Sequence, residues 1–116
     1  GEIIHADKQK ALEYMKKSAD EGYTFACAVL GTMYYSGEEG MAAKDYKKAF
    51  EYLSIAVKDA ASLNEDLLAE VYKNLGACYR FGRGTDKDQS LASYYTEQAA
   101  KYGDKSSVDA VKMMRK

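Results

Sequence analysis

The sequence predicts an all-α solenoid in which pairs of antiparallel helices stack side by side, and three observations lead to that prediction. The 116 residues contain no proline, so no missing backbone donor interrupts a helix. Small and aromatic residues recur every three or four positions, as they do on one face of a helix. Two such patterns alternate along the chain at intervals of about forty residues, which indicates a helical-repeat array.

The first pattern, Leu-Gly-x-x-Tyr-x-x-Gly, occurs twice, at residues 30–37 and 75–82. A glycine inside a helix costs about 1 kcal/mol relative to alanine. We therefore expect Gly31 and Gly76 to be places where a neighbouring helix approaches closely. The glycine that closes each copy is expected to end its helix in a left-handed conformation.

The second pattern, Ala-x-x-Tyr followed by a pair of small residues, occurs three times, at residues 11–19, 49–57 and 92–100. An aspartate lies four residues before each opening alanine and is expected to cap the helix that follows. Another small residue comes three positions after each copy, where a helix is expected to end. The capping aspartates are Asp7, Asp45 and Asp88, and the closing residues are Gly22, Ala60 and Gly103.

Together the patterns predict six helices, near residues 7–20, 24–36, 45–59, 65–80, 88–101 and 105–115. Between Ala60 and Val71 the second copy carries extra residues, which we expect to form a longer connection. A small insertion is expected in the loop after residue 37. The tyrosines at motif positions are expected in the core, because a large ring beside alanine or glycine fills the space between close helices. They are Tyr14, Tyr34, Tyr52, Tyr79 and Tyr95.

These residues resemble Sel1-like repeats, which are related to the tetratricopeptide repeat. The resemblance is carried by Leu-Gly-x-x-Tyr-x-x-Gly-x-Gly at residues 75–84 and by the pattern from Asp88 to Gly103, and it covers nearly the whole chain. It implies one domain over residues 1–116 that forms a right-handed α/α superhelix. It also implies a scaffold whose concave face holds a protein or peptide, with no catalytic residues.

By analogy with tetratricopeptide repeats, the resemblance implies that the Leu-Gly-x-x-Tyr helices line the concave face. Tyr35 and Arg80 are the leading candidates, because tyrosine and arginine often anchor interfaces. The candidate partner-binding residues are Phe25, Thr32, Tyr35, Glu70, Lys73, Arg80 and Asp109, and Ala28, Ala77 and Met113 are expected to share that face.

The start of the chain is expected to be a loop. Gly1 lies six residues before Asp7, as Gly82 lies six before Asp88. The alignment predicts that the chain opens after a helix that is not part of it. We expect a piece of a longer array, or else a native cap with Gly1 left over from production of the chain.

Little in the sequence indicates chemistry. The single histidine, His5, is expected in the opening loop, without partners for a metal or a catalytic dyad. The run from Gly82 to Thr85 lacks the Gly-Lys-Ser/Thr ending of a phosphate loop and is expected to be a turn between helices. Asp86 and Asp88 lack the other ligands of a calcium loop. We therefore expect no cofactor, no metal and no enzyme.

The two cysteines are expected to be buried free thiols. Cys27 lies four residues before its motif glycine and Cys78 two after its own. This offset of six corresponds to about 9 Å along a helix, whereas a disulfide needs Cα atoms within about 7 Å. The cysteine-rich branch of the family uses bridges within each helix pair, a spacing that this chain lacks.

The balance of charges bears on the choice of partner. There are 17 Lys and Arg residues against 18 Asp and Glu, which argues against a surface built to bind many phosphates. A nucleic-acid-binding helical repeat stays the alternative to a protein-binding scaffold, and an enzyme with an unrecognised site is a third. No apolar run reaches the roughly 18 residues of a membrane span, so we expect a soluble protein, either cytoplasmic or exported with its signal removed. The sequence identifies neither the partner nor the oligomeric state.

Overall fold

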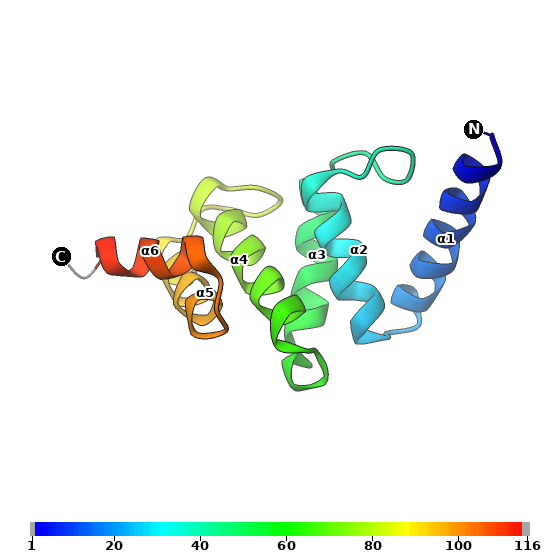
Figure 1. The fold of residues 1–116 in the computed structure, drawn as a ribbon. Coiled ribbons are helices and arrows are strands. Elements are labelled where there is room, and N and C mark those ends of the chain that lie inside the picture. Colours follow the sequence, from blue (N-terminus) through cyan, green and yellow to red (C-terminus); the bar gives the residue numbers. More distant parts are fainter. Residues whose placement is uncertain (1, 115–116) are drawn as a thin grey trace.

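A computed structural model describes the backbone of residues 2–114 and the side chains of residues 7–114. This part of the chain forms α1 (Glu2–Asp20), α2 (Thr24–Ser36), α3 (Tyr46–Val57), a 3-10 turn η1 (Ala60–Ser62), α4 (Glu65–Phe81), α5 (Gln89–Lys101) and α6 (Lys105–Met114) (Figure 1). The predicted all-α solenoid and its six helices are therefore confirmed. Helices α3, α4, α5 and α6 begin and end within two residues of their expected bounds, and the bounds of α2 are those expected.

The helices follow one another along an elongated molecule of 52 × 25 × 24 Å (Figure 1). The most extensive contacts join α2 to α3 and α4 to α5, and these two pairs meet where α4 packs on α2 and α3. At the ends, α1 packs on α2 and α6 packs on α5. Each helix thus contacts mainly its neighbours, as in other repeat arrays.

Two of the three predicted aspartate caps are confirmed. The backbone N–H of Lys48 donates to Asp45 Oδ1 at 3.0 Å, and that of Leu91 donates to Asp88 Oδ1 at 3.0 Å. These bonds satisfy backbone donors that have no partner inside the first turn of a helix. They set where α3 and α5 begin.

The prediction for the start of the chain is wrong. Residues 2–6 are helical, so Asp7 lies inside α1 and does not cap it, and His5 lies in a helix and not in a loop. The aligned loop needs Gly84 at φ +76°. Ile3 stands at the corresponding position, and a β-branched residue does not adopt that conformation readily, so the helix extends.

The close contacts expected of the motif glycines are confirmed. A Cβ atom on Gly31 would lie 2.7 Å from Leu53 Cγ of α3, and one on Gly76 would lie 3.0 Å from Thr96 Oγ1 of α5. The glycines expected to end helices also have positive φ, namely Gly22, Gly37, Gly82 and Gly103. Ala60 lacks this freedom and opens the 3-10 turn of the longer connection.

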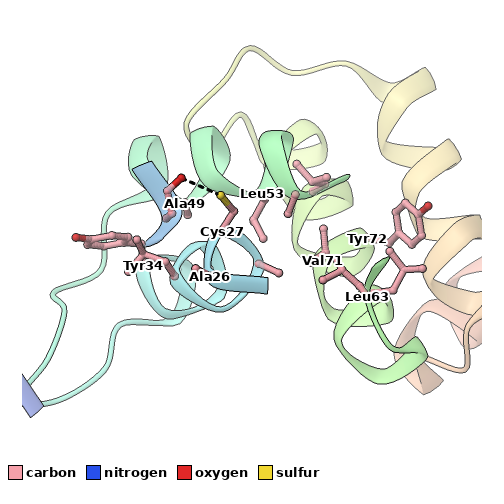
Figure 2. Close-up of a cluster of buried hydrophobic side chains, with 14 of the residues drawn as sticks. Ala26, Cys27, Tyr34, Ala49, Leu53, Leu63, Val71 and Tyr72 are labelled. Atoms are coloured by element: carbon pink, nitrogen blue, oxygen red, sulfur yellow. Dashed lines mark hydrogen bonds between the residues drawn. The ribbon is translucent and has the colours of Figure 1, made fainter. Parts of the chain in front are cut away.

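The core runs through the middle of the array (Figure 2). Its fully buried members include Leu30, Leu53 and Val71, contributed by α2, α3 and α4. Three of the five motif tyrosines, Tyr34, Tyr52 and Tyr95, belong to this core or pack against it, and Tyr79 is partly buried beside Tyr95. Tyr34 is buried and stacks on Tyr52 with ring centroids 6.1 Å apart, and Tyr79 stacks on Tyr95 at 5.8 Å.

The fifth motif tyrosine departs from the prediction. Tyr14 of α1 is 75% exposed, so its expected place in the core is wrong. The tyrosines at the same position in α3 and α5 are covered by the ring of a Leu-Gly-x-x-Tyr helix. Among the described residues, no Leu-Gly-x-x-Tyr helix covers the side of α1 that carries Tyr14.

Candidate functional site

The strongest candidate site is a depression formed by α4, α5 and α6. It has a volume of about 160 Å³. Lys73 and Arg80, both predicted to bind a partner, lie in it together, as does Ala77. The full lining is Lys73, Ala77, Arg80, Thr96, Ser106, Ser107 and Ala110. Because α4 packs on α2 and lines the depression together with α6, we call the exposed and partly exposed residues of these three helices the α2–α4–α6 face.

The Arg80 guanidinium is held in place within this depression. Its Nη2 donates to Thr96 Oγ1 at 3.0 Å, and the Thr96 hydroxyl donates to the carbonyl of Ala92 at 2.7 Å. The single ion pair among residues 7–114 joins Lys73 Nζ to Glu70 Oε1 at 3.3 Å. Arg80 therefore has no carboxylate partner within the described part of the chain, and its charge is available to a ligand.

The α6 side of the depression is held by Asp104. Its Oδ2 accepts from the Ser107 backbone N–H at 2.9 Å, from the Ser107 hydroxyl at 2.6 Å and from the Ser106 hydroxyl at 2.8 Å. Burial acts to raise the pKa of Asp104, but these bonds and the nearby Lys73 charge together lower it below its ordinary value. Asp104 thus caps α6, a role that the sequence reasoning missed although it stands directly after Gly103.

Tyr35 lies in a separate cluster on the same face. Its hydroxyl accepts a hydrogen bond from Arg83 Nη1 at 2.8 Å, and its ring lies 5.4 Å from that of Tyr46. The guanidinium of Arg83 also lies over the rings of Tyr46 at 5.1 Å and Phe81 at 4.6 Å. Arg83 thereby ties the loop after α4 to α2 and α3. Sequence reasoning treated it only as part of a turn, because Tyr35 is 48 residues away.

The other predicted residues are dispersed. Phe25 is exposed at the start of α2, next to α1, and does not line the depression. Thr32 is partly exposed and donates to the carbonyl of Ala28 at 2.9 Å, within its own helix. Asp109 is exposed on α6, but Ser106, Ser107 and Ala110 supply that helix's share of the lining.

Of two further residues expected on this face, Met113 is exposed and Ala28 is buried. Met113 is 70% exposed on α6. Ala28 is completely buried, so its expected exposure on the face is wrong. Its position in α2 turns it toward neighbouring helices, because α4 packs directly on α2.

Both thiols are buried and free, as predicted. Burial raises the pKa of Cys78 to about 11, against the opposing charge of Arg83. Burial and the carboxylate of Asp20 raise the pKa of Cys27, whose Sγ lies 3.5 Å from the Ala19 carbonyl (Figure 2). Neither thiol is ionised at neutral pH, so neither is poised as a nucleophile.

Two other kinds of feature, a metal site and a membrane span, are absent from the described residues. Residues 7–114 hold no group of three or more His, Cys, Asp or Glu side chains with the geometry of a metal site. Among the helices described, none offers an apolar stretch long enough to cross a bilayer.

Comparison with known proteins agrees with this architecture. The Sel1 repeat family model matches residues 1–23, 24–59 and 69–104. A Sel1 repeat protein from Oxalobacter formigenes has a similar fold, with a TM-score of 0.70 and 23% identity over 91% of this chain and 28% of that one. Helicobacter pylori cysteine rich protein B gives a TM-score of 0.64 and 26% identity over 89% of this chain and 71% of its own.

The chain spans less than a third of the length of the Oxalobacter protein. No curated protein gives a significant match. The family match nevertheless extends over most of the sequence, in register with the motifs and the helices that they form. The chain belongs to the Sel1 repeat family.

Proposed function

We propose that this chain is a protein- or peptide-binding scaffold without catalytic activity, and that its ligand binds along the α2–α4–α6 face. The observation that carries the proposal is Arg80, whose charge lies in a polar depression and has no carboxylate partner among residues 7–114. Family membership supports the same conclusion, because Sel1 repeats commonly serve in protein interactions.

The chemistry of the depression favours a carboxylate from the partner. An arginine presents several N–H donors in a fixed plane, and a carboxylate can accept two of them in parallel. Thr96 uses one donor of Arg80 and fixes the orientation of the group before a ligand arrives. The hydroxyls of Ser106 and Ser107 lie beside it but are already engaged by Asp104. The ligand proposed is therefore a segment with an aspartate, a glutamate or a free C-terminus.

The charges around the depression argue against nucleic acid. Glu70 neutralises Lys73, and Asp104 lies near the same lysine. A phosphate backbone gains affinity from several unpaired cations in a row. One unpaired arginine bordered by carboxylates selects a single anionic group instead.

The test is a selection of peptides displayed on phage against the immobilised chain, followed by titration of synthetic peptides. We expect enrichment of segments with an acidic residue. Arg80→Gln should weaken their binding about tenfold, the loss typical of an anchoring charge. The Thr96 hydroxyl keeps its bond to the Ala92 carbonyl in this variant, so the melting temperature should change little.

The matched control is Lys101→Gln, which removes an exposed cation from α5, outside the depression. It should leave affinity unchanged. Equal affinity of the selected peptides for the Arg80→Gln and Lys101→Gln proteins would overturn the proposal. So would selective capture of single-stranded RNA in low salt with no peptide enriched.

A further inference from the structure

The depression beside Arg80 has a hydrogen-bond donor on one side and hydroxyl groups on the other. Its α4 side carries the Arg80 guanidinium, which can only donate. Its α5 and α6 sides carry the hydroxyls of Thr96, Ser106 and Ser107. A hydroxyl can both donate and accept, so what these three offer a ligand depends on where their protons are already used.

All three hydroxyl protons are used within the chain. The Thr96 hydroxyl lies 2.7 Å from the Ala92 carbonyl oxygen, which can only accept, so the hydroxyl is the donor. The hydroxyls of Ser106 and Ser107 lie 2.8 and 2.6 Å from Asp104 Oδ2. Although burial acts in the opposite direction, the bonds to these serines help to keep the pKa of Asp104 below its ordinary value, so its carboxylate is ionised at neutral pH and can only accept. The three hydroxyls therefore offer a ligand lone pairs and no proton.

Ser106 is the hydroxyl best placed to accept a hydrogen bond from a ligand. Ser107 and Thr96 are buried, and the Thr96 oxygen already accepts from Arg80 Nη2. Ser106 is exposed, and no group among residues 7–114 donates to its oxygen. A ligand that binds Arg80 through an anion therefore meets an unoccupied acceptor at Ser106 in the same depression.

The small size of the depression limits the groups that can satisfy both sides at once. Its volume of about 160 Å³ lies below the roughly 300–1,000 Å³ that is typical of small-molecule sites. In a C-terminal residue, the α-carboxylate and the backbone N–H are attached to the same Cα atom, so both can enter together. In an internal aspartate or glutamate, the carboxylate lies at the end of a side chain while the backbone continues in both directions, so the N–H stays further away.

We propose that the depression binds the C-terminal residue of a partner chain, with its α-carboxylate on Arg80 and its backbone N–H donated to Ser106 Oγ. This binding mode rests on the proposed function and narrows its ligand to a free C-terminus, in preference to an internal acidic side chain. An anion without a neighbouring N–H would leave the Ser106 lone pairs to water and gain only the contact with Arg80.

The test compares two small carboxylates that differ in one group. N-Acetyl-L-alanine reproduces a C-terminal residue with its N–H, and O-acetyl-L-lactate replaces that N–H by an ester oxygen. Each is titrated into the whole, isotope-labelled chain, and the amide shifts of Ala77 and Ala110, which line the depression, give the dissociation constants by nuclear magnetic resonance. N-Acetyl-L-alanine should bind about tenfold more tightly, because in the ester two acceptors face each other where the amide makes a hydrogen bond.

A matched pair of serine variants tests the acceptor. Ser106→Ala should weaken the binding of N-acetyl-L-alanine about tenfold and leave that of O-acetyl-L-lactate unchanged, so the preference between the probes disappears. The control is Ser90→Ala on α5. Ser90 is also exposed and also lies two residues after the aspartate that caps its helix, but it does not line the depression. The preference should therefore persist in Ser90→Ala.

Equal binding of the two probes, with both weakened by Arg80→Gln, would overturn the C-terminal binding mode and leave the proposed function standing. Affinities that Arg80→Gln does not change would overturn both. Absence of any saturable shift with N-acetyl-L-alanine would overturn the C-terminal binding mode, as would a preference for it that survives in Ser106→Ala.

Discussion

The two central helix pairs have the same sequence motif but different partners for its glycine. In the α2–α3 pair, Gly31 lies against the branched carbon of Leu53, whereas in the α4–α5 pair Gly76 lies against the hydroxyl of Thr96. The tyrosine stack three residues later is nearly the same in both, at 6.1 and 5.8 Å. The motif therefore specifies a close approach and a ring stack, while the residue opposite the glycine varies.

The loops that connect the two helices of each pair differ in length. After α2, the insertion folds into a turn closed by a bridge between Glu38 and Ala42. After α4, the shorter loop contains Gly84, which lies directly against the carbonyl of Tyr46 in α3. Both loops still end with the capping aspartate, whose N–H donates to the motif tyrosine's carbonyl at 2.8 or 2.9 Å. The extra residues are absorbed as a local turn, and the helices stay in register.

The largest effect is expected at the tight loop. Gly84→Ala should destabilise the protein by about 3 kcal/mol, because a left-handed residue gains a Cβ that collides with the Tyr46 backbone. Urea unfolding measures the change. Gly22→Ala is the control, since it has φ +92° but nothing within 4 Å, and it should lose only about 1 kcal/mol. Equal losses would show that the contact with α3 is unimportant.

The next comparison is between the two motif glycines. Gly31→Ala should destabilise by about 1–2 kcal/mol net, since the clash with Leu53 exceeds the gain in helix propensity. Gly76→Ala should change stability by less than about 1 kcal/mol, because the Thr96 hydroxyl can shift by a few tenths of an ångström. Thermal and urea unfolding of both variants provide the test. A larger loss at Gly76 would reverse the comparison.

Both pairs have the same aspartate cap, so removing either cap should cause a smaller and equal loss of stability. Asp45→Ala and Asp88→Ala should each lose about 1 kcal/mol, the usual contribution of a side-chain cap. Asparagine at either position should restore most of it. A difference of more than about 1 kcal/mol between the two alanine variants would indicate that the surrounding loops, and not the caps, set where the helices begin.

The smallest effect concerns pH at the start of α6. The folded pKa of Asp104 is lowered, so its contribution to stability is present above the unfolded pKa of about 3.9 and is lost as the pH falls through the folded value. Asp104→Asn keeps a cap but does not titrate. The stability difference between the native protein and Asp104→Asn should therefore shrink on acidification from pH 7 to pH 3. A difference that grows on acidification would contradict the assigned direction.

Features that depend on a few neighbouring residues were predictable from the sequence. Asp45, Asp88 and the glycines that end helices act within one turn, so their spacing suffices. Gly31 was predictable for a related reason, because a glycine inside a repeating helical stripe is explained only by contact with another helix.

Features that depend on distant elements were not predictable. Tyr14 has the motif and still lies exposed, because a motif residue is buried only when a second helix supplies the other half of the contact. Ala28 is buried for the opposite reason, since α4 packs directly on α2. Arg83 owes its place to aromatic rings from α2 and α3, which the sequence separates widely from it.

The neighbour-by-neighbour packing of this array has a mechanical consequence. The α2–α3 and α4–α5 pairs are packed more extensively within themselves than against each other, and η1 joins them. A force pulling the two ends apart therefore loads these units in series, like turns of a spring. Among α2 to α5, the contacts of α4 with α2 and α3 are less extensive than those inside either pair, so this middle part of the array bends there while each pair keeps its shape.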